Sequence, residues 1–253
     1  MKPVTAQLQS SDFWDGYPRN ASLTGKRAQA RKPSPLTSMG GRHTEARMRN
    51  TSASIKLWAL ALVIASGSLV SPQSTHAAGL DTSSRIIAPP RVTEGQVVRY
   101  LVPRYNGAYT YADIRWIVGR DFDVSVKAGV DPLVVIAQMD LETGHLSSYW
   151  SQRPRRNPAG IGVTGAPGAG VSFPRWYDSV DAHVGRLLAY ALPKGAGTDE
   201  QKRLIAIALS WRPLPDSYRG SAGTIYGLQS RWATDRYYAA KLARVGDAID
   251  ATR

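Results

Sequence analysis

Residues 129–144, GVDPLVVIAQMDLETG, contain a helix together with the signals that begin and end it. Asp131 followed by Pro132 is typical of a helix start, because the aspartate can cap free N–H groups and proline fits the first helical position. Apolar residues then recur at helical spacing, and Gly144 is a typical stop. The stretch predicts a helix that begins near Pro132 and ends at Gly144.

Glu142 lies on the last turn of this predicted helix. Carbonyl groups at a helix C-terminus repel a negative charge, so this position favours the protonated form of the carboxyl group. A carboxylic acid that keeps its proton near neutral pH is what glycosidic bond cleavage requires of its general acid. An ordinary surface glutamate near a helix end is the alternative that the position alone leaves open.

The rest of the chain from residue 111 onward is also mainly helical in its pattern. The stretch at 157–174 is the exception, because it is rich in glycine and proline and its alternating apolar residues predict a small β-hairpin. The other predicted helices are marked by an apolar stripe or by an N-terminal cap. They lie at 114–122, at 180–191, after a capping box formed by Thr198 and Gln201, and after a cap at Asp235. The predicted fold class is mainly α, a helical domain with a short β-hairpin lobe.

The N-terminal part of the chain has a different composition. Residues 57–70, LWALALVIASGSLV, form an uncharged apolar run, shorter than the about 20 residues that a membrane span needs. Met48 and a short basic segment precede the run, and small residues near Ala77 follow it. This pattern predicts a secretory signal peptide at 48–77, with an uncleaved anchor as the alternative. We therefore expect residues 1–47 to be an upstream extension that does not belong to the native protein, and their composition predicts disorder.

The chain has 253 residues with 43% hydrophobic composition, which suffices for one well-packed domain. We expect a linker or arm at 78–110, with one β-like run at 96–102. A single folded domain is expected at 111–253.

The formal net charge of +13 divides between the two parts of the chain. Residues 1–77 hold 10 Lys/Arg and 3 Asp/Glu, whereas residues 78–253 hold 22 and 16. The exported part therefore keeps a net charge of +6, which favours polyanions such as a bacterial cell wall or an anionic membrane surface. Export argues against nucleic acid as a partner. The absence of cysteine from the sequence rules out disulfides and thiolate metal sites.

Four short blocks resemble, in this order, motifs of bacterial cell-wall glucosaminidases. They are GVDPLVVIAQMDLETG at 129–144, NPAGIG at 157–162, Phe173 with YDS at 177–179, and WATDRYY at 232–238. Each block alone is weak evidence. Four blocks in the family's order favour the resemblance over the alternative that Glu142 is an ordinary surface residue. The chain thus resembles the mannosyl-glycoprotein endo-β-N-acetylglucosaminidase-like enzymes of glycoside hydrolase family 73, and the resemblance covers roughly residues 111–250.

The resemblance implies a lysozyme-like helical fold with a cleft, and hydrolysis of the β-1,4 bond after N-acetylglucosamine in peptidoglycan. Glu142 matches the family's general acid. Tyr238 matches a tyrosine close to the reaction centre, with a packed aromatic side chain as the alternative. Six further residues match the blocks or carry rings that can stack on sugars, although most of the rings are expected in the core. These candidate substrate-binding residues are Asn157, Gly160, Phe173, Trp176, Tyr177 and Trp232.

The sequence departs from the family pattern in its second carboxylate. Between Glu142 and Asp178 there is no Asp or Glu, although other members carry a candidate base in the hairpin lobe. An inverting enzyme needs a base about 6.5–9.5 Å from the acid. Asp178 or Asp181 can supply it, with helix capping as the alternative for Asp178. Otherwise the substrate's own 2-acetamido group takes part, or the protein binds glycan and cleaves it slowly or not at all.

The remaining polar candidates are weaker. His145 directly follows the predicted helix end at Gly144. The arginines at 153, 155 and 156 form a basic cluster, and the simplest expectation is that they lie in a solvent-exposed loop. With only His145 and His183 after residue 77, we expect no metal site and no cofactor.

The sequence predicts a peptidoglycan hydrolase that is secreted, periplasmic or bound to the cell wall and acts on glycan strands. Membrane contact is expected only through an uncleaved signal segment. A lytic transglycosylase and a non-catalytic wall-binding module are the alternatives.

Overall fold

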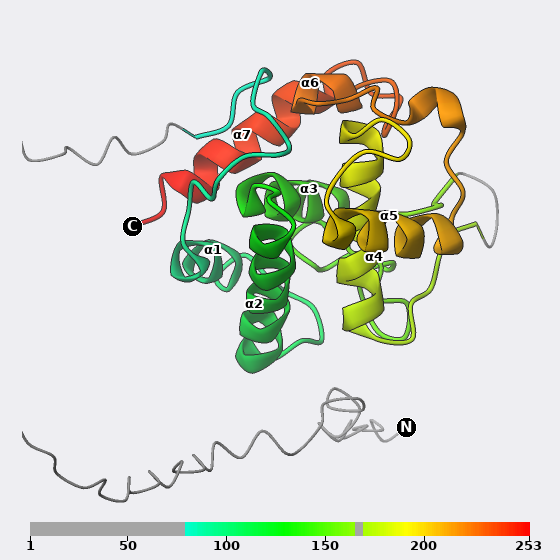
Figure 1. Ribbon diagram of the computed structural model, residues 1–253. Helices are drawn as coiled ribbons and strands as arrows, with labels where there is room; N and C mark the ends of the chain where they lie inside the picture. The colour runs from blue at the N-terminus through cyan, green and yellow to red at the C-terminus, as the bar shows by residue number, and fades with distance from the viewer. Residues whose placement is uncertain (1–78, 165–168) are drawn as a thin grey trace, which may run out of the picture. The chain divides into compact units, whose positions relative to one another are not determined.

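The computed structural model describes residues 79–164 and 169–253, and within them the chain is helical (Figure 1). Helices α2 (Tyr111–Lys127) and α4 (Trp176–Ala191) contain the predicted apolar stripes, and β-structure in the described ranges is limited to three isolated bridges. The mainly α fold class is therefore confirmed. The helices are α1 (Glu94–Leu101), α2 (Tyr111–Lys127), α3 (Pro132–Thr143), α4 (Trp176–Ala191), α5 (Asp199–Trp211), the short 3-10 helix η2 (Asp216–Tyr218), α6 (Ile225–Leu228) and α7 (Tyr238–Asp250).

Helix α3 lies at the centre of the described helices, between α7 and α4 (Figure 1). Ten of its twelve residues are buried, and Leu133 and Ile136 have no exposed surface. At its start, Asp131 Oδ1 accepts a hydrogen bond from the Leu133 N–H at 3.0 Å. At its end, Gly144 adopts a left-handed conformation with φ 55°, which costs little in a residue without a Cβ. Both ends of the predicted helix are confirmed.

The segment before α2 belongs to the same compact unit as the other helices. The predicted β-like run at 96–102 is wrong, because most of these residues form α1. A reciprocal capping box between Thr93 and Gln96 begins the helix. An apolar run this short fits the spacing of a strand and of a helix equally well. The capping box before it is the signal that favours the helix. The Tyr100 hydroxyl then donates to Asp140 Oδ2 at 3.1 Å, which fastens α1 to α3.

The predicted β-hairpin at 157–174 is an irregular loop in its described parts, and residues 165–168 lie outside the described ranges. Asn157 organises this loop from a fully buried position. Its Nδ2 donates to the carbonyls of Ile161 and Val171 at 2.9 Å, and its Oδ1 accepts from the Ile161 N–H. One backbone hydrogen bond, from the Val171 N–H to the Ile161 carbonyl, joins the two arms. A side-chain amide thus holds the loop together where a strand ladder was predicted.

The last two long helices differ in how well their starts were predicted. The capping box of Thr198 and Gln201 begins α5 as expected. Helix α7 begins at Tyr238 rather than directly after Asp235, so that predicted cap is wrong. The Asp235 carboxylate instead accepts a hydrogen bond from the Tyr237 N–H at 2.8 Å and organises the turn before the helix.

The predicted upstream extension at 1–47 and signal peptide at 48–77 lie outside the described residues. Within the part of the chain that the structure describes, no helix is both long and apolar enough to cross a membrane.

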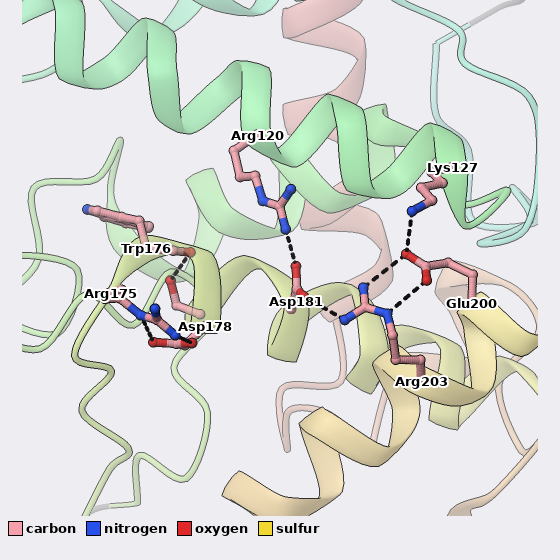
Figure 2. Close-up of polar contacts among 9 residues, drawn as sticks. Arg120, Lys127, Arg175, Trp176, Asp178, Asp181, Glu200 and Arg203 are labelled. Carbon is pink, nitrogen blue, oxygen red and sulfur yellow. Dashed lines mark hydrogen bonds and ion pairs between the residues drawn. The ribbon is translucent and has the colours of Figure 1, made fainter. Parts of the chain in front are cut away.

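Ion pairs join α2, α4 and α5 (Figure 2). Asp181 of α4 lies between Arg120 of α2, at 2.6 Å, and Arg203 of α5, at 3.2 Å. Arg203 also pairs with Glu200 at 2.8 Å, and Lys127 of α2 reaches Glu200 at 3.5 Å. Because Asp181 is buried, the network satisfies a carboxylate that would be costly to bury alone.

We expect Glu200 to make the acid stability of the protein depend on this network. A hydrogen bond from Arg203, together with its charge, holds the pKa of Glu200 at about 2, below the usual 4.5. Because the folded pKa is depressed, the stabilisation is complete above the unfolded pKa and is lost as the pH falls toward about 2. Glu200→Gln should therefore lower the free energy of unfolding by up to about 1 kcal/mol near neutral pH and by almost nothing near pH 2. Urea unfolding across this range measures the difference, and an equal loss at every pH would contradict it.

Gly185 marks a close approach of α4 to α5. A Cβ at this position would overlap the backbone carbonyl of Leu204, which cannot move aside as the end of a side chain can. Gly185→Ala should therefore lower the free energy of unfolding by about 1–3 kcal/mol. Gly223→Ala is the matched control, because nothing lies within 4 Å of a Cβ there. Urea unfolding of both variants tests this, and equal stabilities would show that the two helices can separate without cost.

Candidate active site

Glu142 and Tyr238, the two residues expected at the reaction centre, are in direct contact. Glu142 lies half-buried on the last turn of α3, and Tyr238 is the buried first residue of α7. The Tyr238 hydroxyl donates to Glu142 Oε1 at 2.7 Å. The packing of α7 against α3 therefore brings together two groups that are 96 residues apart in the sequence.

The Tyr238 hydroxyl has a second partner, which the sequence analysis missed. Gln138 lies one turn before Glu142 on the same face of α3, and its Nε2 donates to the hydroxyl at 2.8 Å. Gln138 Oε1 in turn lies 2.9 Å from Nε2 of His183 on α4. Gln138 and His183 are both fully buried. The four-residue spacing from Glu142 was a signal for Gln138, whereas His183 carried none.

The second oxygen of Glu142 faces the loop that Asn157 organises. A Cβ added to Gly160 would lie 3.3 Å from Glu142 Oε2. Gly160 has a φ of 59°, which favours a residue without a Cβ. Trp232, half-buried in the loop before α7, also lies close enough to the Glu142 carboxyl group to lower its pKa. Two of the six candidate substrate-binding residues, Gly160 and Trp232, therefore lie beside Glu142.

Burial raises the pKa of Glu142 above its usual 4.5. The hydrogen bond from Tyr238 and the nearby Trp232 favour the carboxylate and oppose this rise without cancelling it. The direction agrees with the sequence prediction, and desolvation is its largest cause. Burial also lowers the pKa of His183 to about 3, so its imidazole is neutral near neutral pH.

Both candidates for a second carboxylate are bound to arginine (Figure 2). Asp178, on the first turn of α4, forms a two-bond ion pair with Arg175, at 2.9 and 2.8 Å. Asp181 is buried between Arg120 and Arg203. Asp178 does not cap α4 either, because Arg175 occupies the N-cap position. To act as a general base, either aspartate would first have to leave its arginine.

The other candidate substrate-binding residues contribute to packing. Phe173 and Trp176 are 0% and 3% exposed, and the Asn157 side chain bonds to its own loop. The ring of half-buried Tyr177 lies 5.0 Å from that of Trp116. A buried side chain offers little surface to a ligand, and in this structure Asn157, Phe173 and Trp176 contribute to packing, so their sugar contacts stay a prediction.

The loop after α3 provides little further chemistry. His145 Nδ1 lies 2.5 Å from Asp140 Oδ1, so the histidine binds Asp140 rather than Glu142. In the basic cluster, the Arg155 guanidinium lies 3.3 Å from the centre of the Tyr149 ring. Among the described residues, no group of three or more His, Asp and Glu is placed to hold a metal ion.

No protein-family model matches the chain. An uncharacterised protein of Borreliella burgdorferi is 33% identical over 127 residues, which are 49% of this chain and 56% of that protein. The chain thus spans about half the length of the curated relative that it matches. Among solved structures, the catalytic domain of the autolysin Auto from Listeria monocytogenes is 20% identical, with 64% of this chain and 98% of that chain covered and a TM-score of 0.35. A likeness of this size establishes neither the fold nor the activity.

We expect Tyr238→Phe to raise the pKa of Glu142 further, because it removes a hydrogen bond that stabilises the carboxylate. NMR titration of ¹³C-labelled glutamate side chains measures this pKa, and the Glu142 signal is assigned by its absence from Glu142→Gln. The wild-type value should lie above 4.5. Tyr237→Phe is the matched control, because the Tyr237 side chain is exposed and should leave the value unchanged. A wild-type pKa at or below 4.5 would contradict the effect of burial.

Proposed function

We propose that this chain is a peptidoglycan hydrolase with a lysozyme-like helical fold, and that Glu142 is its general acid. The proposal is carried by the half-buried Glu142 carboxyl group, whose pKa is raised and whose Oε1 is held by Tyr238 at 2.7 Å. A carboxyl group of this kind keeps its proton to higher pH and can give it to a glycosidic oxygen. The proposed target is the β-1,4 bond after N-acetylglucosamine, as the four sequence blocks imply.

The two oxygens of Glu142 have different surroundings, which decides where the proton is placed. Oε1 accepts from Tyr238, so the acid proton belongs on Oε2, which faces Gly160. In the proposed reaction this proton passes to the departing glycosidic oxygen as the C1–O bond breaks, and Glu142 becomes a carboxylate. Tyr238 donates to that carboxylate, and Trp232 beside it also favours the charged form. The carboxylate can then accept a proton from the water that completes hydrolysis.

A lytic transglycosylase is the second candidate function, and one observation favours it. Such an enzyme needs one catalytic glutamate and no paired carboxylate, and both possible bases, Asp178 and Asp181, are bound to arginine. A hydroxyl of the sugar itself then replaces water and leaves an anhydro-sugar terminus. Within the hydrolase proposal, the 2-acetamido group of the substrate would act as the nucleophile, as in substrate-assisted hydrolases, so that no second protein carboxylate is needed.

Peptidoglycan glycan strands are the proposed partner, and the periplasm or cell wall is the proposed location. The net charge of +6 on residues 78–253 favours an acidic wall polymer. The predicted signal peptide at 48–77 would carry the domain there.

Glu142→Gln tests the proposal, because it keeps the size of the side chain and removes the acidic proton. We expect the release of muropeptides from purified sacculi to fall by about 10²–10⁴-fold. Glu94→Gln is the matched control, since Glu94 lies in the first turn of α1 and should keep full activity. Mass spectrometry of the products identifies the bond that is cut and separates reducing ends from anhydro-sugar ends.

Two outcomes would oppose the proposal. Turnover by Glu142→Gln at the wild-type rate would place the general acid elsewhere. Binding of sacculi by the wild-type protein without any release of muropeptides would favour a non-catalytic wall-binding module.

A further inference from the structure

A chain of hydrogen bonds connects His183 to Glu142 through Gln138 and Tyr238, and the donor in each bond can be assigned, starting at His183. This side chain is 0% exposed, and its Nε2 lies 2.9 Å from Gln138 Oε1, an atom that can only accept. Nε2 therefore carries the imidazole hydrogen. The other ring nitrogen, Nδ1, has no hydrogen-bond partner among the described residues. We therefore expect Nδ1 to be unprotonated, because a buried N–H group without an acceptor is rare in folded proteins.

The direction continues through Gln138 to Tyr238. Because Oε1 of Gln138 faces His183, its Nε2 faces Tyr238 and donates to the hydroxyl oxygen at 2.8 Å. The hydroxyl hydrogen is then directed to Glu142 Oε1 at 2.7 Å. We call these four residues, His183, Gln138, Tyr238 and Glu142, the relay.

The reversed orientation of the Gln138 amide would have two consequences. Its Oε1 would face Tyr238 and compete with Glu142 for the hydroxyl hydrogen. Its Nε2 would face His183, whose single hydrogen would have to move to Nδ1, where it has no partner among the described residues. The imidazole of His183 therefore selects one of the two amide orientations.

We propose that His183 is a positioning residue that, by orienting Gln138, directs the Tyr238 hydrogen to Glu142 Oε1 and leaves the acid proton on Oε2. This inference rests on the proposed role of Glu142 as general acid. His183 and Gln138 touch no reacting atom in this scheme, because they act through Tyr238.

The protonation states of the relay are consistent with this direction. Burial lowers the pKa of His183 to about 3, which keeps the ring neutral with a single hydrogen. Burial raises the pKa of Tyr238 well above 10, so its phenol keeps its hydrogen. Among the described residues, the groups near the relay include the Trp232 ring, which lies 6.0 Å from the His183 ring and lowers the Glu142 pKa, and Tyr190, which raises the Tyr238 pKa. None of these groups is charged near neutral pH, so none opposes the direction of the hydrogen bonds.

Three variants of the full protein test the inference through the pKa of Glu142, measured by NMR titration as above. His183→Leu removes the group that orients Gln138, so the Glu142 pKa should rise by at least about half of the rise seen in Tyr238→Phe. In Gln138→Met no carbonyl competes for the hydroxyl hydrogen, so the pKa should stay close to the wild-type value. The double variant His183→Leu/Gln138→Met should therefore return the pKa toward the wild-type value.

A purely structural role for His183 gives a different pattern. The effects of the two substitutions on the Glu142 pKa would then add or reinforce each other in the double variant. The absence of a pKa rise in His183→Leu, or of its reversal in the double variant, would overturn the inference. If circular dichroism shows that His183→Leu does not fold, the inference is tested instead by the tautomer of His183 in the wild-type protein. Two-bond ¹⁵N–¹H correlation should then show neutral His183 with its hydrogen on Nε2, and a hydrogen on Nδ1 would overturn the inference.

These measurements need no turnover, so the relay and the proposed function can fail separately. If the pKa shifts occur while Glu142→Gln keeps full activity, the relay stands and the proposed general acid is wrong. If the protein cleaves peptidoglycan, the alkaline limb of its kcat/KM profile, which reports the free protein, should move to higher pH in His183→Leu together with the Glu142 pKa. A limb that stays in place while the pKa rises would overturn the link between the relay and catalysis.

Discussion

The burial of α3 on nearly every face is the constraint on which the rest of the domain depends. An unpaired polar group in such a place costs about 1–3 kcal/mol, so the polar side chains of α3 need partners from neighbouring helices. Three helices supply them: Tyr100 of α1 bonds to Asp140, His183 of α4 to Gln138, and Tyr238 of α7 to Glu142. The few polar residues of a mainly apolar helix thus specify how α1, α4 and α7 dock on it, which the apolar contacts alone would leave less defined.

The same constraint produces the chemistry of the site. Glu142 lies half-buried on the last turn of α3, so its carboxyl group is partly desolvated. Oε1 points inward to Tyr238, and Oε2 points outward to the loop at Gly160. The inward hydrogen bonds fix which oxygen keeps the proton, and desolvation raises the pH at which the proton is lost. Glycine at 160 leaves room in front of the outward oxygen.

The features that could be predicted from the sequence are those with a local signal. Asp131 and Gly144 mark the ends of α3 within one turn, and both were predicted correctly. The run at 96–102 was assigned wrongly because its short apolar pattern fits two periods, and only the cap before it separates them. The contact between Gln138 and His183 could not be predicted, since a histidine within an apolar stripe gives no sign of a partner 45 residues away. The pairing of Glu142 with Tyr238 was within reach only through the family resemblance.

Another carboxyl group in the domain shows why burial alone does not make a general acid. Asp121 lies within α2, away from the helix end, with 0% exposure and no hydrogen-bond partner at either oxygen among the described residues. Burial raises its pKa to about 8, so it holds a proton at neutral pH where no substrate can reach it. Glu142 is only half-buried, and Tyr238 and Trp232 limit the rise of its pKa and would stabilise the carboxylate left by the proposed proton transfer. Desolvation thus favours the protonated form of both side chains, whereas the proposed release to a substrate requires partial exposure and a hydrogen-bond donor to the carboxylate, which Glu142 has and Asp121 lacks.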